Sequence, residues 1–253
     1  MVSGLLGINV RNVEPNEFSS TVSIVTFNQI EPQEQRHTYC TGSLISQRHV
    51  LSAEHCFDEI GNTKFEILAE SYNLTCAKRF YPSWWTTFDQ WKFSTKKPNY
   101  FRDNDISIIK IVGSVSPDTQ PALISLISPQ SLLYGLQALM VGFGSTHENA
   151  NPTILHKGAV NIISKEECQG KIARLAGDIM TVHLRYLCSF SEPYTQIANG
   201  DSGGPLFYEG VIVGINKGLV PKFRNLFHRH KVNVHTGVDY YREFIDFQMG
   251  ILY

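Results

Sequence analysis

The sequence lacks an excess of charge of either sign, because 22 Lys and Arg residues stand against 23 Asp and Glu residues, which leaves a net charge of −1. Neither sign dominates the long-range field, so we expect neither a nucleic acid nor a membrane surface as a partner. No run of about 18 apolar residues occurs, which excludes a transmembrane helix. Charged residues make up 18% of the chain and hydrophobic residues 42%, and this balance excludes wholesale disorder.

Internal repeats, low-complexity tracts and linkers rich in Pro, Gly or Ser are also lacking. A length of 253 residues then allows one large domain or two small ones. The start, Met1 to Ile8, has no basic region and no long apolar stretch, so it is not typical of a signal peptide. If the chain forms disulfides, either this start is trimmed or an export signal has been removed.

Strand-like runs of β-branched and aromatic residues recur between turn residues and outnumber helical patterns, which favours an all-β sandwich or barrel. These runs cover residues 21–27, 43–46, 106–112, 139–143 and 211–215. Apolar residues recur at helical spacing near the end of the chain and predict a closing helix. A second short helix is expected around residues 165–175.

Three short segments carry an isolated Ser, His and Asp in contexts that suit nucleophilic catalysis. His55 follows a strand-like run, Asp105 opens an apolar strand, and Ser202 is flanked by glycines. A serine hydroxyl is a weak nucleophile at neutral pH, so it needs a neutral imidazole to take its proton and a carboxylate to orient that imidazole. Taken singly, each segment could equally be a turn or a structural residue.

The order and neighbours of the three residues are similar to those of the chymotrypsin/trypsin family of serine endopeptidases. The similarity is collinear from about Gly7 to Met249, and Gly200-Asp201-Ser202-Gly203-Gly204-Pro205 is its most specific motif. Tyr39-Cys40-Thr41-Gly42 and Gly142-Phe143-Gly144 also resemble family segments. The resemblance implies an all-β fold of two packed six-stranded antiparallel β-barrels of the chymotrypsin type with a C-terminal α-helix.

The resemblance also implies a division of the chain into parts. Residues 7–253 would form a single peptidase domain, with barrel halves at about 20–120 and 121–237 and the helix at about 238–249. Residues 1–6 would be an extension or the remnant of a propeptide.

The same resemblance assigns a role to each site residue. Ser202 would attack the scissile carbonyl, His55 would act as base and then as acid, and Asp105 would orient His55. The backbone N–H groups of Gly200 and Ser202 would stabilise the oxyanion, a contribution of about 3 kcal/mol for each donor. The implied chemistry would be peptide-bond hydrolysis through an acyl-enzyme, with no cofactor and no metal.

Activation is the first departure from the family pattern. Asp201 would pair with an α-amino group that a cleavage has freed, but the stretch Leu6-Gly7-Ile8-Asn9-Val10 is preceded by no Lys or Arg. A trypsin-type cut therefore has no evident site. Another protease would have to cut near Gly7 or Ile8, or the chain matures otherwise or stays zymogen-like.

The specificity pocket is the second departure. Its base carries Gln196, and its walls carry Asn216 and Asn233 where glycine is usual. A neutral base gives a buried guanidinium no counter-ion, and the wall side chains narrow the slot. Strict specificity for Arg or Lys is therefore not expected, and an occluded pocket is the alternative.

The five cysteines are an odd number, so at least one thiol has no partner within the chain. The resemblance pairs Cys40 with Cys56 and Cys168 with Cys188, and leaves Cys76 unpaired. Disulfides place the protein in the secretory pathway. There Asn73, in Asn73-Leu74-Thr75, would be a glycosylation site.

Three other stretches have both a functional and a structural interpretation. The aromatic residues of 80–93 form either a recognition loop or a packed loop, and packing is the default. The basic stretch from Lys222 to Lys231 would bind an acidic ligand or form a solvated hairpin. His228, His230 and His235 have no carboxylate or cysteine to complete a metal site.

The function that these observations favour is that of a secreted, monomeric serine endopeptidase. Its partners would be protein or peptide substrates and macromolecular inhibitors. The alternative is a catalytically inactive, protease-like binding protein that uses its surface loops. An intracellular protease of related fold is disfavoured by Asp201 and by the expected disulfides.

Overall fold

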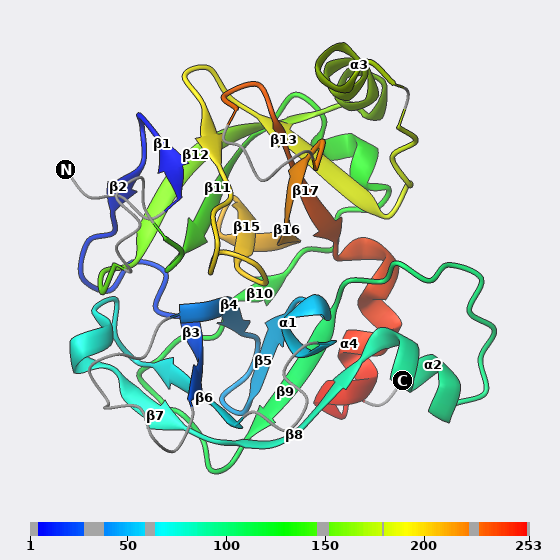
Figure 1. The fold of residues 1–253 in the computed structure, drawn as a ribbon. Helices are drawn as coiled ribbons and strands as arrows, with labels where there is room; N and C mark the ends of the chain where they lie inside the picture. Colours follow the sequence, from blue (N-terminus) through cyan, green and yellow to red (C-terminus); the bar gives the residue numbers. More distant parts are fainter. Residues whose placement is uncertain are drawn as a thin grey trace.

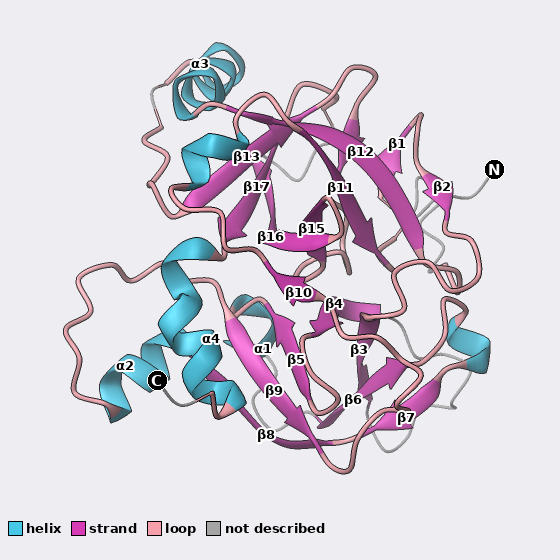
Figure 2. Ribbon diagram, turned by 180° about the vertical axis from the view of Figure 1, so that it is seen from behind, coloured by secondary structure: helices cyan, strands magenta, loops and turns pink. Residues whose placement is uncertain are grey.

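Two curled β-sheets make up most of the protein and lie one above the other (Figure 1). The computed structural model describes residues 5–27, 38–58, 64–145, 152–178, 180–222 and 228–251. The architecture is that of the chymotrypsin fold, as the sequence predicts, with helices confined to the surface and the C-terminus (Figure 2).

The first sheet has seven antiparallel strands in the order β7-β6-β3-β4-β5-β9-β8. Its strands are β3 (Thr21–Phe27), β4 (Thr38–Leu44), β5 (His49–Ser52), β6 (Lys64–Ala69), β7 (Lys78–Phe80), β8 (Pro82–Thr87) and β9 (Ser107–Ile111). The strand expected at 43–46 in fact ends at Leu44, because Ile45 N–H bonds back to the His49 carbonyl in the turn before β5.

The second sheet closes into a six-stranded barrel, β16-β15-β11-β12-β13-β17, because β16 also pairs with β17. Its strands are β11 (Gln137–Gly142), β12 (His156–Ile163), β13 (Tyr186–Phe190), β15 (Pro205–Tyr208), β16 (Val211–Val220) and β17 (Val232–Gly237). Two short strands extend it, β2 (Arg11–Asn12) beside β12 and β10 (Leu123–Ile124) parallel to β16. A separate pair joins β1 (Leu6–Gly7) to β14 (Thr195–Gln196).

Within the described residues, four α-helices accompany the sheets: α1 (His55–Asp58), α2 (Phe88–Ser94), α3 (Lys165–Ala176) and α4 (Arg242–Met249). Helix α3 matches the expected second helix. It is capped by the Ser164 side chain, which accepts the Glu167 N–H, and it ends at Gly177 in the left-handed region. Helix α4 begins at Arg242 rather than 238, because Asp239–Tyr241 form a 3-10 turn. In the parts of the chain that are described, no helix is long and apolar enough to cross a membrane.

The aromatic stretch of residues 80–93 forms β8 and α2 rather than a continuous loop. Thr87 and Gln90 form a capping box that starts α2. Phe88 and Trp91 are buried against Phe244 of α4, with ring centroids 5.7 and 5.6 Å from it. Helices α2 and α4 therefore lie side by side (Figure 2). Packing is the structural role of these two rings.

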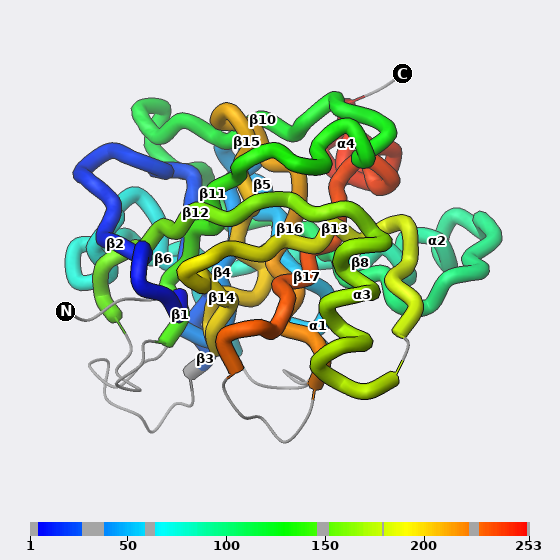
Figure 3. Tube along the Cα trace, turned by 90° about the horizontal axis from the view of Figure 1, so that it is seen from above, coloured from blue at the N-terminus to red at the C-terminus, as the bar shows by residue number. Residues whose placement is uncertain are grey.

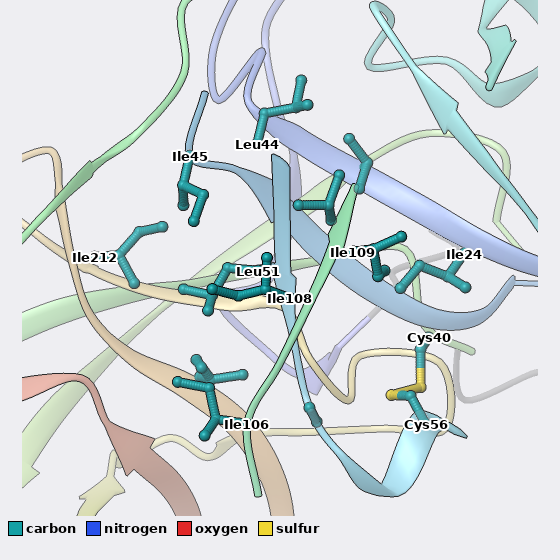
Figure 4. Close-up of a cluster of buried hydrophobic side chains, with 14 of the residues drawn as sticks. Ile24, Cys40, Leu44, Ile45, Leu51, Cys56, Ile106, Ile108, Ile109 and Ile212 are labelled. Carbon is teal, nitrogen blue, oxygen red and sulfur yellow. A yellow bond between two sulfur atoms is a disulfide. The ribbon is translucent and has the colours of Figure 1, made fainter. Parts of the chain in front are cut away.

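The largest hydrophobic core spans the junction between the two sheets. Ile108 of β9 and Ile212 of β16 belong to this core, and the Cys40–Cys56 disulfide lies at its edge (Figure 4). A second core fills the closed barrel, and a third lies beneath α3. The shared core fixes one sheet against the other, and this brings residues from both halves together at the junction.

Candidate active site

His55 and Asp105 meet at the sheet junction because β5 and β9 are paired, with Ser52 opposite Ser107. The Asp105 carboxylate lies 2.8 Å (Oδ2) and 3.0 Å (Oδ1) from His55 Nδ1, and Oδ1 also accepts the His55 backbone N–H at 3.0 Å. Asp105 is only 3% exposed, whereas the His55 side chain is 40% exposed. A buried carboxylate thus orients a partly exposed imidazole.

The charge of Asp105 is maintained by its contacts. Burial alone would raise the pKa of this carboxyl, but the hydrogen bond and charge of His55, followed by the charge of Lys217, lower the pKa to about 2. Asp105 is therefore ionised throughout the neutral range. The neighbouring Glu54 differs, because burial raises its pKa to about 8 and leaves its carboxyl neutral at pH 7.

The loop that carries Ser202 is fixed to the first sheet through Thr41 of β4. Thr41 N–H donates to the Ser202 carbonyl at 2.8 Å, and Thr41 Oγ1 donates to the Gly200 carbonyl at 2.7 Å. Gly200 has φ +93° and Gly203 has φ +81°. A Cβ on Gly203 would lie 2.1 Å from Ser52 Oγ, so only glycine fits there. These contacts hold the Ser202 backbone beside β4.

Asp201 is fully buried beneath this loop, where its carboxylate accepts three backbone N–H groups. Those of Ala198 and Gly144 lie at 2.8 Å, and the third belongs to Leu5. A Cβ on Gly144 would lie 2.4 Å from the Asp201 carboxyl carbon, which explains why glycine stands there. Burial raises the pKa of Asp201 to about 7, against the effect of its three donors.

The residue beside Asp201 is Leu5, not Gly7 or Ile8 as expected from the sequence. The Leu5 side chain is fully buried in the core of the closed barrel, whereas Ile8 is 69% exposed. Gly7 instead pairs with Thr195 in the short β1–β14 ladder. Apolar burial thus selects Leu5, and the ordered body includes two residues that the sequence analysis assigned to an extension.

The three predicted specificity residues are all buried and hydrogen-bonded. Gln196 Nε2 donates to the His228 and Lys231 carbonyls, at 3.0 and 3.1 Å. Asn233 accepts the Ile197 N–H and donates to the Thr195 carbonyl, both at 2.9 Å. Among the described residues, the buried Gln196 Oε1 and Asn216 Nδ2 atoms have no hydrogen-bond partner.

Asn216 and the fully buried His235 complete this polar cluster. Asn216 Oδ1 lies 3.0 Å from His235 Nδ1, and His235 Nε2 lies 2.8 Å from Ser189 Oγ. Burial lowers the pKa of His235 to about 3, so the ring is neutral. Side chains of β13, β16 and β17 therefore occupy this region with neutral polar groups.

Comparison with known proteins assigns the chain to a family. The family model described as Trypsin matches residues 8–245. The chain belongs to the trypsin family. Snake venom serine protease homolog KN7 of Trimeresurus stejnegeri is 29% identical over 212 residues, which cover 79% of this chain and 72% of the homolog. Trypsin II-P29 of Gallus gallus is 30% identical over 184 residues, which cover 70% of this chain and 67% of that protein.

A solved structure described as neuropsin, a serine protease expressed in the limbic system of mouse brain, has the same fold. Its TM-score is 0.71 at 21% identity, with 96% of this chain and 99% of that chain covered. Trypsin-like proteases act on protein or peptide substrates. The names of the relatives include both trypsins and venom protease homologs, so membership of the family does not by itself decide between a protease and a binding protein.

Four of the five cysteines of this trypsin-family chain form the two disulfides that the sequence predicts. Disulfides join Cys40 to Cys56 and Cys168 to Cys188, and Cys76 is free and exposed. The two disulfides fit an extracellular protein. Cys40 and Cys56 lie close to His55, but their sulfurs are bonded to each other and cannot serve as thiolate ligands for a metal.

Of two predicted surface features, the Asn73 site lies within the described residues and the basic stretch only in part. Asn73 caps a 3-10 helix, and its Oδ1 accepts from Thr75 Oγ1 at 2.9 Å. In the basic stretch from Lys222 to Lys231, residues 223–227 lie outside the described residues. His235 is buried in the polar cluster, away from the exposed His230.

The sequence did not predict a site role for four residues that lie near the site: Leu5, Thr41, Ser189 and Lys217. Lys217 Nζ lies 3.3 Å from Asp105 Oδ2. The only sequence signal for Leu5 is the pattern of two leucines before a glycine. Nothing local distinguishes Thr41 or Lys217 from other strand residues, because their contacts come from distant parts of the chain.

Proposed function

We propose that this protein is a serine endopeptidase that uses Ser202, His55 and Asp105. The observation that carries the proposal is the His55–Asp105 pair, in which a buried carboxylate of low pKa binds Nδ1 of a half-exposed imidazole. This arrangement leaves Nε2 of the ring to accept a proton. The Ser202 loop at the same junction, and the family of the chain, support the same function.

In the proposed reaction His55 removes the Ser202 hydroxyl proton while Ser202 Oγ attacks the substrate carbonyl carbon. The tetrahedral oxyanion receives hydrogen bonds from the Gly200 and Ser202 N–H groups. The C–N bond then breaks, and the departing amine takes the proton from the imidazolium. A water molecule, deprotonated by the same imidazole, hydrolyses the acyl-enzyme and restores Ser202.

Covalent labelling tests this proposal against the alternative, a protease-like binding protein. A fluorophosphonate probe reacts rapidly only with a serine whose base is in place. We expect peptide mapping by mass spectrometry to find one adduct, on Ser202. A chain that is folded and fully processed yet acquires no adduct would favour the binding protein.

The specificity that the polar cluster supports is a broad one rather than a strict preference for Arg or Lys. Gln196 supplies no negative charge, and the buried side chains of Asn216, Asn233 and His235 occupy space that a long P1 side chain would need. A guanidinium would lose its hydration without gaining a counter-ion. Secretion and glycosylation at Asn73 belong to the same proposal and are supported by the two disulfides.

Peptide substrates that differ only at P1 measure this specificity. We expect kcat/KM for P1 Arg to stay within about tenfold of that for an uncharged side chain of similar length, because no ion pair stabilises the guanidinium. A preference of a thousandfold for Arg would contradict the proposed role of Gln196. The Gln196→Asp variant is the matched positive control, because it restores a negative charge at the same position.

We also propose that a free α-amino group at Leu5 would pair with Asp201. With an intact chain, Leu5 offers only a neutral N–H, and the pKa of Asp201 is raised to about 7. When the pKa of a carboxyl is higher in the folded state than in the unfolded chain, the free energy of unfolding falls as the pH rises from the unfolded to the folded pKa. The intact chain should therefore lose stability between about pH 4 and pH 7 through this group.

A chain that begins at Leu5 should not show this loss, because an ammonium group favours the ionised carboxylate. We expect its thermal unfolding temperature at pH 7.5 to exceed that of the intact chain by several degrees, with a smaller difference at pH 5. Calorimetry at the two pH values measures it. A chain that begins at Leu6 is the control, since it lacks the buried leucine. Equal pH dependence for the intact chain and the Leu5 chain would refute the pairing.

A further inference from the structure

A lysine from the closed barrel contacts the carboxylate of the proposed triad. Lys217 lies on β16 at an irregularity in its pairing with β17, between Asn216 and Gly218. Bulges of this kind redirect side chains at sheet edges and beside active sites. The Lys217 Nζ atom is 3.3 Å from Asp105 Oδ2 and 2.9 Å from Asp103 Oδ1.

The contact involves the same oxygen that His55 uses. Asp105 Oδ2 lies 2.8 Å from His55 Nδ1, so the ammonium and the imidazole share one carboxylate oxygen. The Lys217 side chain is 23% exposed and its ammonium lies over the Tyr186 ring, 5.2 Å from the centroid. Two anchors, Asp103 and the ring, thus hold the cation at Asp105 rather than in free solvent.

We propose that Lys217 is a positioning residue that acts through Asp105 and sets the lowest pH at which His55 can serve as a base. The proposal rests on the proposed function, since it assigns a task to the same triad. An imidazolium at His55 is stabilised by the Asp105 carboxylate and opposed by a cation on the same oxygen. Lys217 therefore favours the neutral ring, which extends the active range toward acid.

The charges around Asp105 decide how far this effect reaches. Asp103 carries an opposite charge, but its side chain is 63% exposed and water screens it, whereas Asp105 is 3% exposed. Glu54 is neutral across the acid limb because its pKa is raised to about 8. The remaining titratable and charged groups that face this carboxylate and its neighbours are Asp58, Asp89, Arg185, Tyr186, Tyr240 and Tyr241. Among the described contacts, none of these groups binds the Asp105 Oδ2 atom that His55 and Lys217 both contact.

The test compares Lys217→Met with the native chain. The rate of Ser202 modification by diisopropyl fluorophosphate is measured from pH 4 to pH 9 by mass spectrometry. We expect the midpoint of the acid limb to move upward by about 0.5 to 1 pH unit when the cation is removed. Lys217→Arg keeps the charge and should keep the native midpoint. Lys217→Gln gives a second neutral side chain.

The matched control is Lys78→Met. Lys78 lies on β7, at the far edge of the first sheet, and pairs with Glu70. Its midpoint should equal that of the native chain. The same midpoint in Lys217→Met, Lys217→Gln and the native chain would overturn the proposal. So would a shift of the same size in Lys78→Met.

A second readout keeps this inference separate from the proposed function. The His55 ring is titrated by NMR, with its signals assigned by their loss in His55→Ala. If Ser202 is never modified at any pH, the proposed function fails, and the ring titration alone decides the role of Lys217. An upward shift of that titration in Lys217→Met supports the role of Lys217, and an unchanged titration refutes it.

Discussion

Replacing Ser202 by alanine should lower the rate of peptide hydrolysis by about three to six orders of magnitude. The change removes the hydroxyl that forms the acyl-enzyme and nothing else that the fold requires. The loop around it is held through backbone groups, since Thr41 bonds the Ser202 and Gly200 carbonyls and Gly203 needs no side chain. We therefore expect an intact oxyanion site and a small residual rate in this variant.

The measurement is kcat/KM on a peptide substrate, with fluorophosphonate labelling alongside it. Ser131→Ala, at an exposed position of a 3-10 turn, is the matched control and should keep native turnover. The Ser202→Ala chain should unfold at the native temperature and should still bind a reversible peptide inhibitor. Native turnover in the variant would assign the hydrolysis to another residue or to a contaminant, and would refute the proposed function.

The parts of the site that the sequence predicts are those encoded in short, contiguous motifs. The flanking glycines single out Ser202, and the resemblance predicts the roles of His55, Asp105 and Ser202 within a stretch that the family model also matches. The disulfide partners follow from the same resemblance, and the structure contains both bonds. Strand β3 and helix α3 follow from periodicity and capping, because both effects act within a few residues.

The parts that could not be predicted depend on contacts between distant segments. Lys217 reaches Asp105 only because β16 bulges and crosses the sheet junction, and a strand pattern does not specify a bulge. Leu5 reaches Asp201 because its side chain enters the barrel core, about 200 residues away in sequence. The view in Figure 3 shows β1 alongside β14 and the beginning of β12. Such placements are properties of the assembled fold.

Asp105→Asn should lower kcat by about four orders of magnitude, because an amide of the same shape cannot replace both carboxylate oxygens. Oδ1 accepts the His55 backbone N–H, and Oδ2 forms the ion pair with Lys217 Nζ and lies nearest His55 Nδ1. If the amide nitrogen takes the Oδ1 position, it faces the backbone donor. If it takes the Oδ2 position, it faces the ammonium and forces the ring proton onto Nε2, where it blocks proton transfer from Ser202.

Either orientation thus places a donor against a donor in a buried site. The second orientation costs more in this chain, because the amide nitrogen then faces the Lys217 ammonium rather than water. The loss should fall on kcat rather than KM, since Asp105 is buried and does not reach the substrate. Steady-state kinetics at pH 8 measure it, with the exposed Asp118→Asn as the matched control. Turnover within tenfold of the native rate would show that the Asp105 carboxylate does not orient the base, and would leave the His55–Asp105 contact as a structural one.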